Sequence, residues 1–337
     1  MRKVIFIVAV LIGLAVWVFY SNTRTWLYAP IPRLTAATIY EVPRGAGWTS
    51  VVNDLHARGV VEHPRELSAW LRYVRPKSKL KAGEYELKPG LTPVELIELL
   101  QSGRVLLHAL TVVEGSTFSD FRRSVYAHKA IKSTTQTWSA QQLMQRLGAT
   151  GQHPEGRFFP DTYKFAKGTT DIELLQQAHR RMQDELDQAW AKRDPDLLLV
   201  DATQALILAS IVEKETALAS ERPMIAGVFA ERLKRGMRLQ TDPTVIYGMG
   251  ERYNGNIRRV DLLRDTPYNT YTRAGLPPTP ICLPGADALQ AAVRPHSIGA
   301  IFFVATGNAD GSHHFSKTLA VHNAAVQRFL KVLRQRQ

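Results

Sequence analysis

The sequence is organised around one apolar stretch, Thr203-Gln-Ala-Leu-Ile-Leu-Ala-Ser-Ile-Val-Glu-Lys-Glu-Thr-Ala-Leu-Ala-Ser220. Its length and its content of Ala, Leu and Ile predict a buried helix. At about 100° per residue, Glu213 projects from a face of small and polar side chains. Glu215 projects instead from the apolar stripe, which is formed by Leu208, Ile211, Val212, Leu218 and Ala219.

The position of Glu215 has a chemical consequence. A carboxylate on an apolar stripe is costly to ionise, so the pKa of Glu215 is expected to rise. A general acid that works near neutral pH needs a raised pKa. The pattern therefore makes Glu215 a candidate general acid, and an ion pair with a buried Arg is the alternative.

Composition limits the classes of function. The chain has 337 residues, of which 45% are hydrophobic and 22% charged, which is typical of globular cores and enough for two domains. The formal net charge of +13 suits an anionic membrane surface, an acidic polymer or nucleic acid. Because the basic residues are scattered and lack interleaved aromatics, we expect no nucleic-acid partner.

The N-terminus carries a targeting signal. Met1-Arg2-Lys3 is basic, and residues 4–20 contain no charged side chain. Such a run is just long enough to span a bilayer, and no Ala-x-Ala cleavage site follows it. Residues 1–21 are therefore predicted to be a cytoplasmic start and a transmembrane signal anchor, with the remaining chain across the membrane. A cleaved signal peptide is the alternative.

Residues 22–37 are predicted to be a linker, and residues 38–125 a small α+β module. The module repeats a strand, a Gly turn and a helix, with strands at 39–42, 84–87 and 110–113 and helices at 49–56, 92–100 and 116–126. In the second copy, Thr92 and Glu95 match a capping box with Pro93 at N1. A further helix is expected at 64–73. The pattern resembles the LysM fold, which binds glycan chains, and a purely structural domain is the alternative.

Residues 126–337 are predicted to form a larger, mainly helical catalytic domain with a β-hairpin near its C-terminus, so the fold class is α+β. Helices are expected at 139–148, 170–192, 220–235, 287–293 and 318–333. The helix at 170–192 is expected to pack on the glutamate helix. A buried strand at 300–305 and a strand at 313–316 are expected to pair around the turn Asn308-Ala309-Asp310-Gly311.

Three loops of this domain carry side chains that suit a sugar. The first is an aromatic cluster with Phe159 and Asp161, because aromatic faces beside polar groups fit sugar rings. The second holds Gln240, Thr241 and Asp242. Thr241 or Asp242 can cap a short helix that begins at Pro243, and a second carboxylate is the alternative role of Asp242. The third joins Asn269-Thr270-Tyr271 to a rigid wall around Pro278, with four prolines in residues 275–285.

Several functional classes have no support in the sequence. The single cysteine, Cys282, excludes an intrachain disulfide and a cysteine metal cluster. His313, His314 and His322 lack metal-ligand spacing, so we expect no metal. No P-loop, Gly-x-Gly-x-x-Gly or Gly-x-Ser-x-Gly motif occurs, and no cofactor is predicted.

The chain resembles the endolytic murein transglycosylases, single-pass proteins of the bacterial inner membrane. The resemblance covers nearly the whole chain. It rests on Glu155-Gly-Arg-Phe-Phe-Pro-Asp-Thr-Tyr163, Ala209-Ser-Ile-Val-Glu-Lys-Glu-Thr216, Leu239-Gln-Thr-Asp-Pro-Thr-Val-Ile-Tyr-Gly248, Tyr268-Asn-Thr-Tyr271, Gly275-Leu-Pro-Pro278 and the pair His313 and Phe315.

The resemblance implies a lytic transglycosylase of the periplasm with Glu215 as its catalytic residue. Such an enzyme cuts the bond between N-acetylmuramic acid and N-acetylglucosamine within peptidoglycan strands and leaves 1,6-anhydro ends. One carboxyl then performs both proton transfers. Glu213 is expected to orient or tune it, His313 to contact substrate, and peptidoglycan synthases are implied partners. A hydrolytic muramidase that uses Asp242 and a membrane-anchored wall-binding scaffold without activity remain alternatives.

Overall fold

A computed structural model describes residues 2–336. The chain divides into two compact units. The first unit holds the residues up to His108 together with Lys164–Thr169, and the second holds Ala109–Tyr163 and the residues from Thr170 onward. Strands β3 (Leu107–Thr111) and β4 (Thr162–Ala166) pair with each other and contribute residues to both units.

The first unit contains a two-stranded antiparallel sheet and three short helices. Strand β1 (Thr38–Val42) pairs with β2 (Gly83–Leu87), and the helices are α2 (Trp48–Ala57), α3 (Pro64–Tyr73) and α4 (Pro93–Ser102). Its core includes Tyr40, Val52, Leu55, Leu67 and Tyr85. The predicted capping box is present: Glu95 N–H donates to Thr92 Oγ1, and Thr92 N–H donates to Glu95 Oε2.

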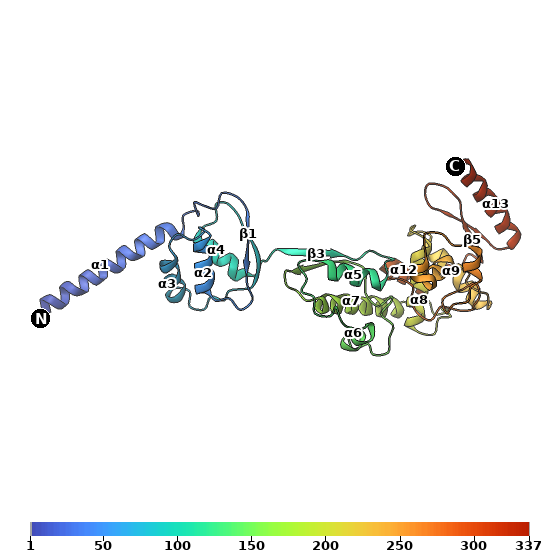
Figure 1. Ribbon diagram of the computed structural model, residues 1–337, viewed down its shortest axis with the longest axis horizontal. Coiled ribbons are helices and arrows are strands. Elements are labelled where there is room, and N and C mark those ends of the chain that lie inside the picture. Colours follow the sequence, from blue (N-terminus) through green and yellow to red (C-terminus); the bar gives the residue numbers. More distant parts are fainter. Residues whose placement is uncertain (1, 337) are drawn as a thin grey trace. The chain divides into compact units, whose positions relative to one another are not determined.

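The first helix, α1 (Arg2–Leu27), belongs to this unit and precedes β1 (Figure 1). Its last turn packs into the module, because Thr23 and Leu27 are buried. Over the residues that the structure describes, no helix combines the length and apolarity that a bilayer crossing requires. The membrane-spanning role predicted for residues 4–20 is therefore not confirmed.

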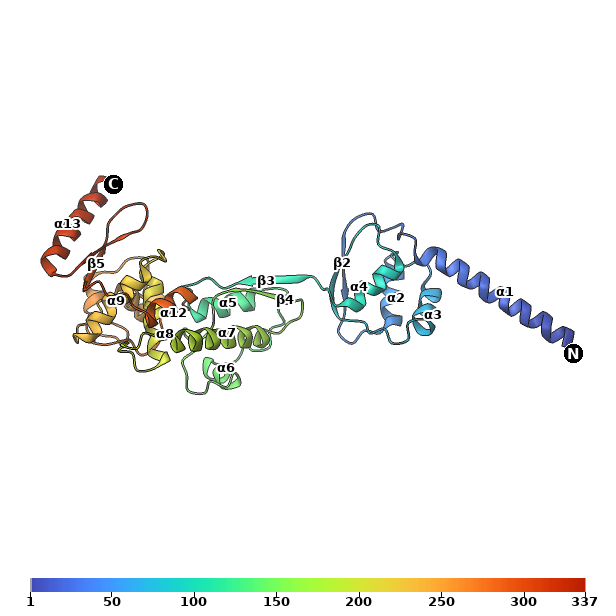
Figure 2. The ribbon, with the colours of Figure 1, turned by 180° about the vertical axis from the view of Figure 1, so that it is seen from behind.

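The second unit is mainly helical. Its helices are α5 (Phe118–Ala127), α6 (Ala140–Arg146), α7 (Asp171–Ala191), α8 (Ala202–Glu215), α9 (Arg222–Lys234), α10 (Asp242–Met249), α11 (Arg259–Leu263), α12 (Ala286–Val293) and α13 (Leu319–Arg336). The predicted hairpin forms as β5 (Phe302–Ala305) and β6 (His313–Ser316), which pair antiparallel with Phe303 opposite Phe315. Figure 2 shows α13 beside this hairpin, and the two are in contact.

Helix α8 is the centre of the second unit. It contacts α7, α9, α10 and α12, and Figure 1 shows the ribbon of α8 near those of α7, α9 and α12. Every residue from Ala205 to Val212 is buried. The predicted packing of α7 on α8 is confirmed. The sequence predicted that one face of this helix is apolar and that the opposite face carries small and polar side chains. That contrast does not separate buried from exposed residues, because Ala209 and Ser210 are as buried as Ile211.

The end of α8 differs from the prediction. The helix stops at Glu215 instead of continuing to Ser220, because Thr216 is extended, with φ −145° and ψ 138°. Thr216 Oγ1 accepts a hydrogen bond from Leu218 N–H at 3.0 Å, which closes a turn in place of another helical turn. Leu218 and Ala219 are therefore not part of the helical stripe, and Glu215 lies at the helix end.

Two strand predictions also need correction. Strand β3 begins at Leu107 instead of Leu110, and β4 was not predicted because its residues follow an aromatic cluster that suggested a loop. The strand predicted as buried at 300–305 forms from Phe302, and all four of its residues are only partly buried. Helix α13 contacts both strands, α9 contacts β5, and Phe303 and Phe315 pack against the hydrophobic core.

Candidate functional site

Glu215 is the last residue of α8 and lines a pocket of about 540 Å³ in the second unit. Thr241 donates a hydrogen bond from Oγ1 to Glu215 Oε1. The other polar side chains that line this pocket are Arg232, Gln240, Asp242, Tyr271, His322 and Asn323, and its apolar wall includes Phe302, Phe303 and Val304 of β5. The Glu215 carboxyl therefore lines a cavity together with several side chains that can form hydrogen bonds.

The protein environment favours the neutral form of Glu215. Burial raises the pKa of this carboxyl from 4.5 to about 7, and the negative charge of Asp242 acts in the same direction. The Thr241 hydroxyl and the positive charges of His313 and Arg232 lower the pKa, but burial outweighs them. Near neutral pH, Glu215 therefore exists in both protonated and ionised forms, as a group that both gives and takes a proton requires.

The loop that carries Thr241 is held in a strained conformation. Gln240 has φ 51°, the only positive φ of a residue other than Gly in the described chain. Thr270 fixes the loop through three contacts: its carbonyl accepts from Gln240 N–H at 3.2 Å, and its hydroxyl lies 3.1 Å from Thr241 N and 2.9 Å from Thr244 Oγ1. Thr270 is buried, so it positions Thr241 against Glu215 instead of facing the pocket.

Asn269 has a similar supporting role. Its side-chain amide donates to the carbonyls of Leu262 at 3.0 Å and Arg264 at 2.7 Å, and its Oδ1 accepts from Tyr271 N–H at 2.8 Å. These contacts use the amide fully and leave Asn269 buried. The residue therefore shapes the segment that presents Tyr271 to the pocket.

Asp242 is exposed at the first turn of α10. The capping role considered for it is not observed: Thr241 occupies the N-cap position, and no side chain caps this helix. Asp242 Oδ1 instead accepts a hydrogen bond from the Tyr271 hydroxyl at 2.6 Å. Because Asp242 and Glu215 line the same pocket, the two carboxyls share one site.

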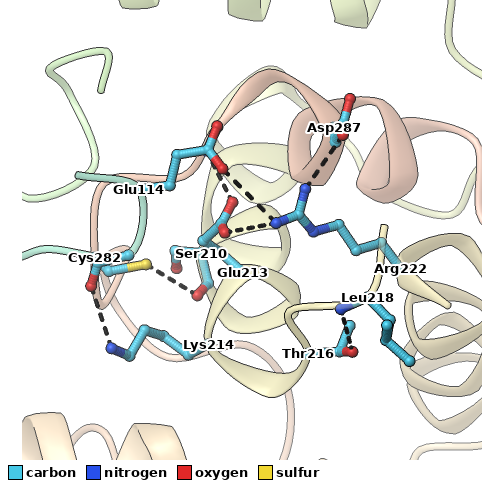
Figure 3. A network of polar contacts seen from close by, with 11 residues as sticks. Glu114, Ser210, Glu213, Lys214, Thr216, Leu218, Arg222, Cys282 and Asp287 are labelled. Carbon is cyan, nitrogen blue, oxygen red and sulfur yellow. Dashed lines mark hydrogen bonds and ion pairs between the residues drawn. The ribbon is translucent and has the colours of Figure 1, made fainter. Parts of the chain in front are cut away.

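Glu213 lies outside the pocket and is buried in an ion-pair network. Its side chain is 5% exposed, and its Oε1 lies 3.0 Å from Arg222 Nη2 of α9. Figure 3 shows Arg222 between Glu213, Asp287 and Glu114. Arg222 Nη1 lies 3.4 Å from Asp287 Oδ2, and Arg222 Nη2 lies 3.8 Å from Glu114 Oε2. Glu213 Oε2 also accepts from Gly285 N–H at 2.9 Å, so this carboxylate joins α8, α9 and the start of α12.

The aromatic cluster is not brought to the pocket. Phe159 is 7% exposed and packs in the hydrophobic core with α7 and α8, where Arg181 covers its ring. Such burial leaves no face for a sugar ring. Asp161 is exposed and accepts from Thr162 N–H, and Pro278 is exposed but does not line the pocket.

Sequence reasoning missed three charged residues near the site. Arg232 is buried, and its guanidinium donates to the carbonyls of Ile301 and Leu239, each at 2.7 Å. Glu221 pairs with His313. Glu155 is buried, accepts hydrogen bonds from Phe118 N–H and the Tyr247 hydroxyl, and has its pKa raised by burial to about 7. Helical periodicity carries no signal for most of these contacts, because 69 residues separate Arg232 from Ile301 and 92 residues separate Glu221 from His313.

The histidines do not form a metal site in the part of the chain that the structure describes. No group of three or more His, Cys, Asp or Glu side chains there is arranged to hold a metal ion. His322 instead stacks on Phe302, with ring centroids 5.1 Å apart.

Comparison with known proteins gives consistent matches. A family model described as the YceG-like family matches residues 40–328. A protein of Bacillus subtilis (strain 168) named endolytic murein transglycosylase is 29% identical over 323 residues, which covers 90% of this chain and 88% of that protein. A protein of the same name from Streptococcus pneumoniae serotype 2 is 29% identical over 297 residues, and the match covers 78% of this chain but only 53% of that longer protein.

A solved structure is also similar. The crystal structure of a yceG-like protein from Listeria monocytogenes superposes with a TM-score of 0.53 and 30% sequence identity. The match covers 86% of this chain and 98% of that chain.

Proposed function

We infer, from the premise that this chain belongs to the YceG-like family, that it is an endolytic murein transglycosylase, a lyase that acts on peptidoglycan. The reaction cleaves the N-acetylmuramic acid to N-acetylglucosamine bond within glycan strands and leaves 1,6-anhydro ends. The observation that carries this proposal is the carboxyl of Glu215, whose pKa burial raises to about 7 and which lines a pocket with polar walls.

In the proposed reaction, the Glu215 carboxyl takes part in two proton transfers. Protonated Glu215 gives its proton to the glycosidic oxygen as the bond from C1 to that oxygen breaks. The C6 hydroxyl oxygen of the muramic acid unit then bonds to C1, and its proton passes to the Glu215 carboxylate. The acid is regenerated and no water is consumed. Neighbouring oxygen dipoles, including Thr241 and the pair of Asp242 and Tyr271, are suited to stabilise positive charge at C1.

A hydrolytic muramidase is the second candidate, because Asp242 is a carboxylate in the same pocket. Hydrolysis with two carboxyls would use Asp242 to activate water or to attack C1. Against this, the Tyr271 hydroxyl donates to Asp242 at 2.6 Å and occupies one of its oxygens.

The reaction products distinguish a lytic transglycosylase from a hydrolytic muramidase. Digestion of purified glycan strands with the full chain, followed by mass spectrometry, is expected to yield fragments with 1,6-anhydro ends. Fragments that carry an added water and a reducing end would establish hydrolysis. Binding without any cleavage would leave the scaffold alternative.

The pH dependence of the reaction follows from Glu215. Because the pKa of the acid is raised to about 7, its protonated form predominates below pH 7 and is lost above it. We expect kcat/KM to fall roughly tenfold per pH unit on the alkaline side of neutrality. A rate of product release that stays constant from pH 6 to pH 9 would contradict the assignment of Glu215 as the acid.

Within the first unit, we propose that the LysM-like module binds glycan. A pocket of about 790 Å³ lies between α2 and the end of α3, lined by Trp48, Arg72, Tyr73 and Arg75 among others. Tyr73 is 77% exposed, and Arg72 lies over its ring at 5.9 Å from the centroid, so the opposite ring face can stack on a sugar. Tyr73→Ala is expected to weaken co-sedimentation with insoluble murein, and unchanged retention would reject this role.

Residues 4–20 are proposed to anchor the chain in the bacterial inner membrane, with the two units in the periplasm. Support comes from the sequence, since this run has no charged residue and follows Arg2 and Lys3. Release of the intact chain from membranes by alkaline carbonate would refute the anchor. Peptidoglycan synthases are proposed partners on family grounds alone.

A further inference from the structure

Arg232 of α9 brings a buried positive charge to the pocket that holds Glu215. The residue is only 8% exposed, yet it lines this pocket together with Glu215, Asp242 and Phe302. Its guanidinium lies over the Phe302 ring, 5.3 Å from the centroid. A guanidinium this deeply buried normally has a carboxylate partner, because desolvation of an unpaired charge is costly.

No carboxylate forms an ion pair with Arg232 in the part of the chain that the structure describes. Burial lowers the pKa of its guanidinium, although Tyr271 and Glu215 act through space in the opposite direction. Arg222 is buried to a similar degree, at 7%, but has three carboxylates at 3.0, 3.4 and 3.8 Å. The charge of Arg232 is therefore compensated much less completely than that of Arg222.

Backbone carbonyls use two of the three guanidinium nitrogens of Arg232. Nε donates to Ile301 at 2.7 Å, and Nη1 donates to Leu239 at 2.7 Å and to Arg238 at 3.4 Å. Among the described residues, no acceptor is found for Nη2, and this atom is not one of the enclosed polar atoms without a partner. Nη2 therefore keeps its hydrogens for a group that enters the pocket.

The chemistry of a guanidinium limits what this group is. A cation binds a carboxylate or another acyl oxygen more strongly than a sugar hydroxyl, because the acyl oxygen carries more negative charge. In a murein strand, N-acetylmuramic acid differs from N-acetylglucosamine by a lactyl ether on O3. The lactyl group ends in a carboxylate or, where a peptide is attached, in an amide carbonyl, so both forms offer an acyl oxygen.

We propose that Nη2 of Arg232 binds the lactyl acyl oxygen of a muramic acid unit, so that this residue selects muramic acid over N-acetylglucosamine in the pocket of Glu215. This inference rests on the proposed function, because the ligand belongs to a murein strand. Arg232 transfers no proton in this role. The carbonyls that hold Nε and Nη1 fix the direction of Nη2 before the sugar binds, which makes the contact preorganised.

A purely structural role is the alternative, since the same guanidinium joins Arg238 and Leu239 to Ile301. Loss of this connection would weaken the binding of every ligand alike. The ratio of affinities for ligands with and without a lactyl group therefore separates the two roles, whereas a single affinity does not.

The test measures this ratio by calorimetry on the full chain with Glu215→Gln, which binds fragments without cleaving them. The ligands are a peptide-free murein tetrasaccharide, the same fragment with its lactyl carboxylates converted to methylamides, and chitotetraose, which has no lactyl group. We expect a Kd about tenfold lower for the carboxylate fragment than for chitotetraose, with the methylamide between them. A methylamide that binds like chitotetraose would assign the contact to the free carboxylate. Equal Kd values for all three ligands would overturn the proposal without any change at Arg232.

Arg232→Met, added to the same protein, is expected to bring the Kd values for the carboxylate fragment and chitotetraose to within about twofold of each other. The matched control is Arg235→Met, directly after α9, where the guanidinium is 47% exposed and Nε lies 2.7 Å from Glu231 Oε1. This control should keep the full preference.

A preference that survives Arg232→Met would show that the residue is only structural. If Arg232→Met does not fold, the comparison of the three ligands still decides. Wild-type chain that releases no anhydro ends would refute the proposed function, whereas an active wild type without a preference for lactyl-bearing fragments would refute this inference alone.

Discussion

Glu215→Gln is expected to lower the release of anhydro-ended fragments roughly 10³-fold while the fold is retained. The amide has the same shape but cannot donate the proton that the leaving oxygen needs, and it cannot take the C6 hydroxyl proton afterwards. Because no other residue is proposed for either transfer, the substitution removes both steps. Initial rates on purified glycan strands, followed by mass spectrometry of the products, measure the loss.

The matched control is Glu185→Gln on α7, where the carboxylate forms a pair with Arg181 at 2.8 Å and does not line the pocket. This variant should keep wild-type activity.

The stability of Glu215→Gln gives a second check. The pKa of Glu215 is raised to about 7 in the folded protein. Between about pH 4.5 and pH 7 this carboxyl ionises in the unfolded chain but stays protonated in the folded one, so the folded protein loses stability as pH rises. At pH 8, Glu215→Gln should therefore unfold no more easily than the wild type, and full activity in this variant would reject the mechanism.

Arg222→Ala is expected to lower the free energy of unfolding by about 3–5 kcal/mol. The guanidinium is the positive partner of Glu213, and both side chains are less than 10% exposed, at 9% (Arg222) and 5% (Glu213). Removal of the cation leaves the Glu213 carboxylate buried with only Gly285 N–H as a donor. Burial already raises the pKa of Glu213, so without Arg222 this side chain should take up a proton or pull the end of α8 out of place.

Urea denaturation at pH 7 measures this loss, and two variants serve as controls. Arg273→Ala removes an exposed pair with Asp265, whose side chains are 54% (Arg273) and 56% (Asp265) exposed, and should cost less than about 1 kcal/mol. The double variant with Arg222→Met and Glu213→Gln leaves no uncompensated charge and should recover much of the stability. A loss as small as that of Arg273→Ala would mean that the network does not hold the site together.

The sequence by itself predicted most of the helices of this protein and singled out the carboxyl that we propose as its general acid. Helices α3, α7 and α9 lie within two residues of their predicted ranges, because capping residues, apolar periodicity and the positions of Pro and Gly act locally. The choice of Glu215 over Glu213 also came from the local pattern around α8. Family membership then supplied the reaction, since several short segments in order are more specific than any composition.

Only the tertiary structure decided what surrounds Glu215. The helix ends at Glu215, where the Thr216 side chain closes a turn that apolar periodicity does not predict. Phe159 belongs to the hydrophobic core. Glu213 belongs to the Arg222 network and also accepts a hydrogen bond from Gly285, which is 72 residues away in the chain. Burial and long-range pairing depend on how distant segments pack, so the contacts of His313 with Glu221, and of Thr241 with Glu215, appear only once the chain is folded.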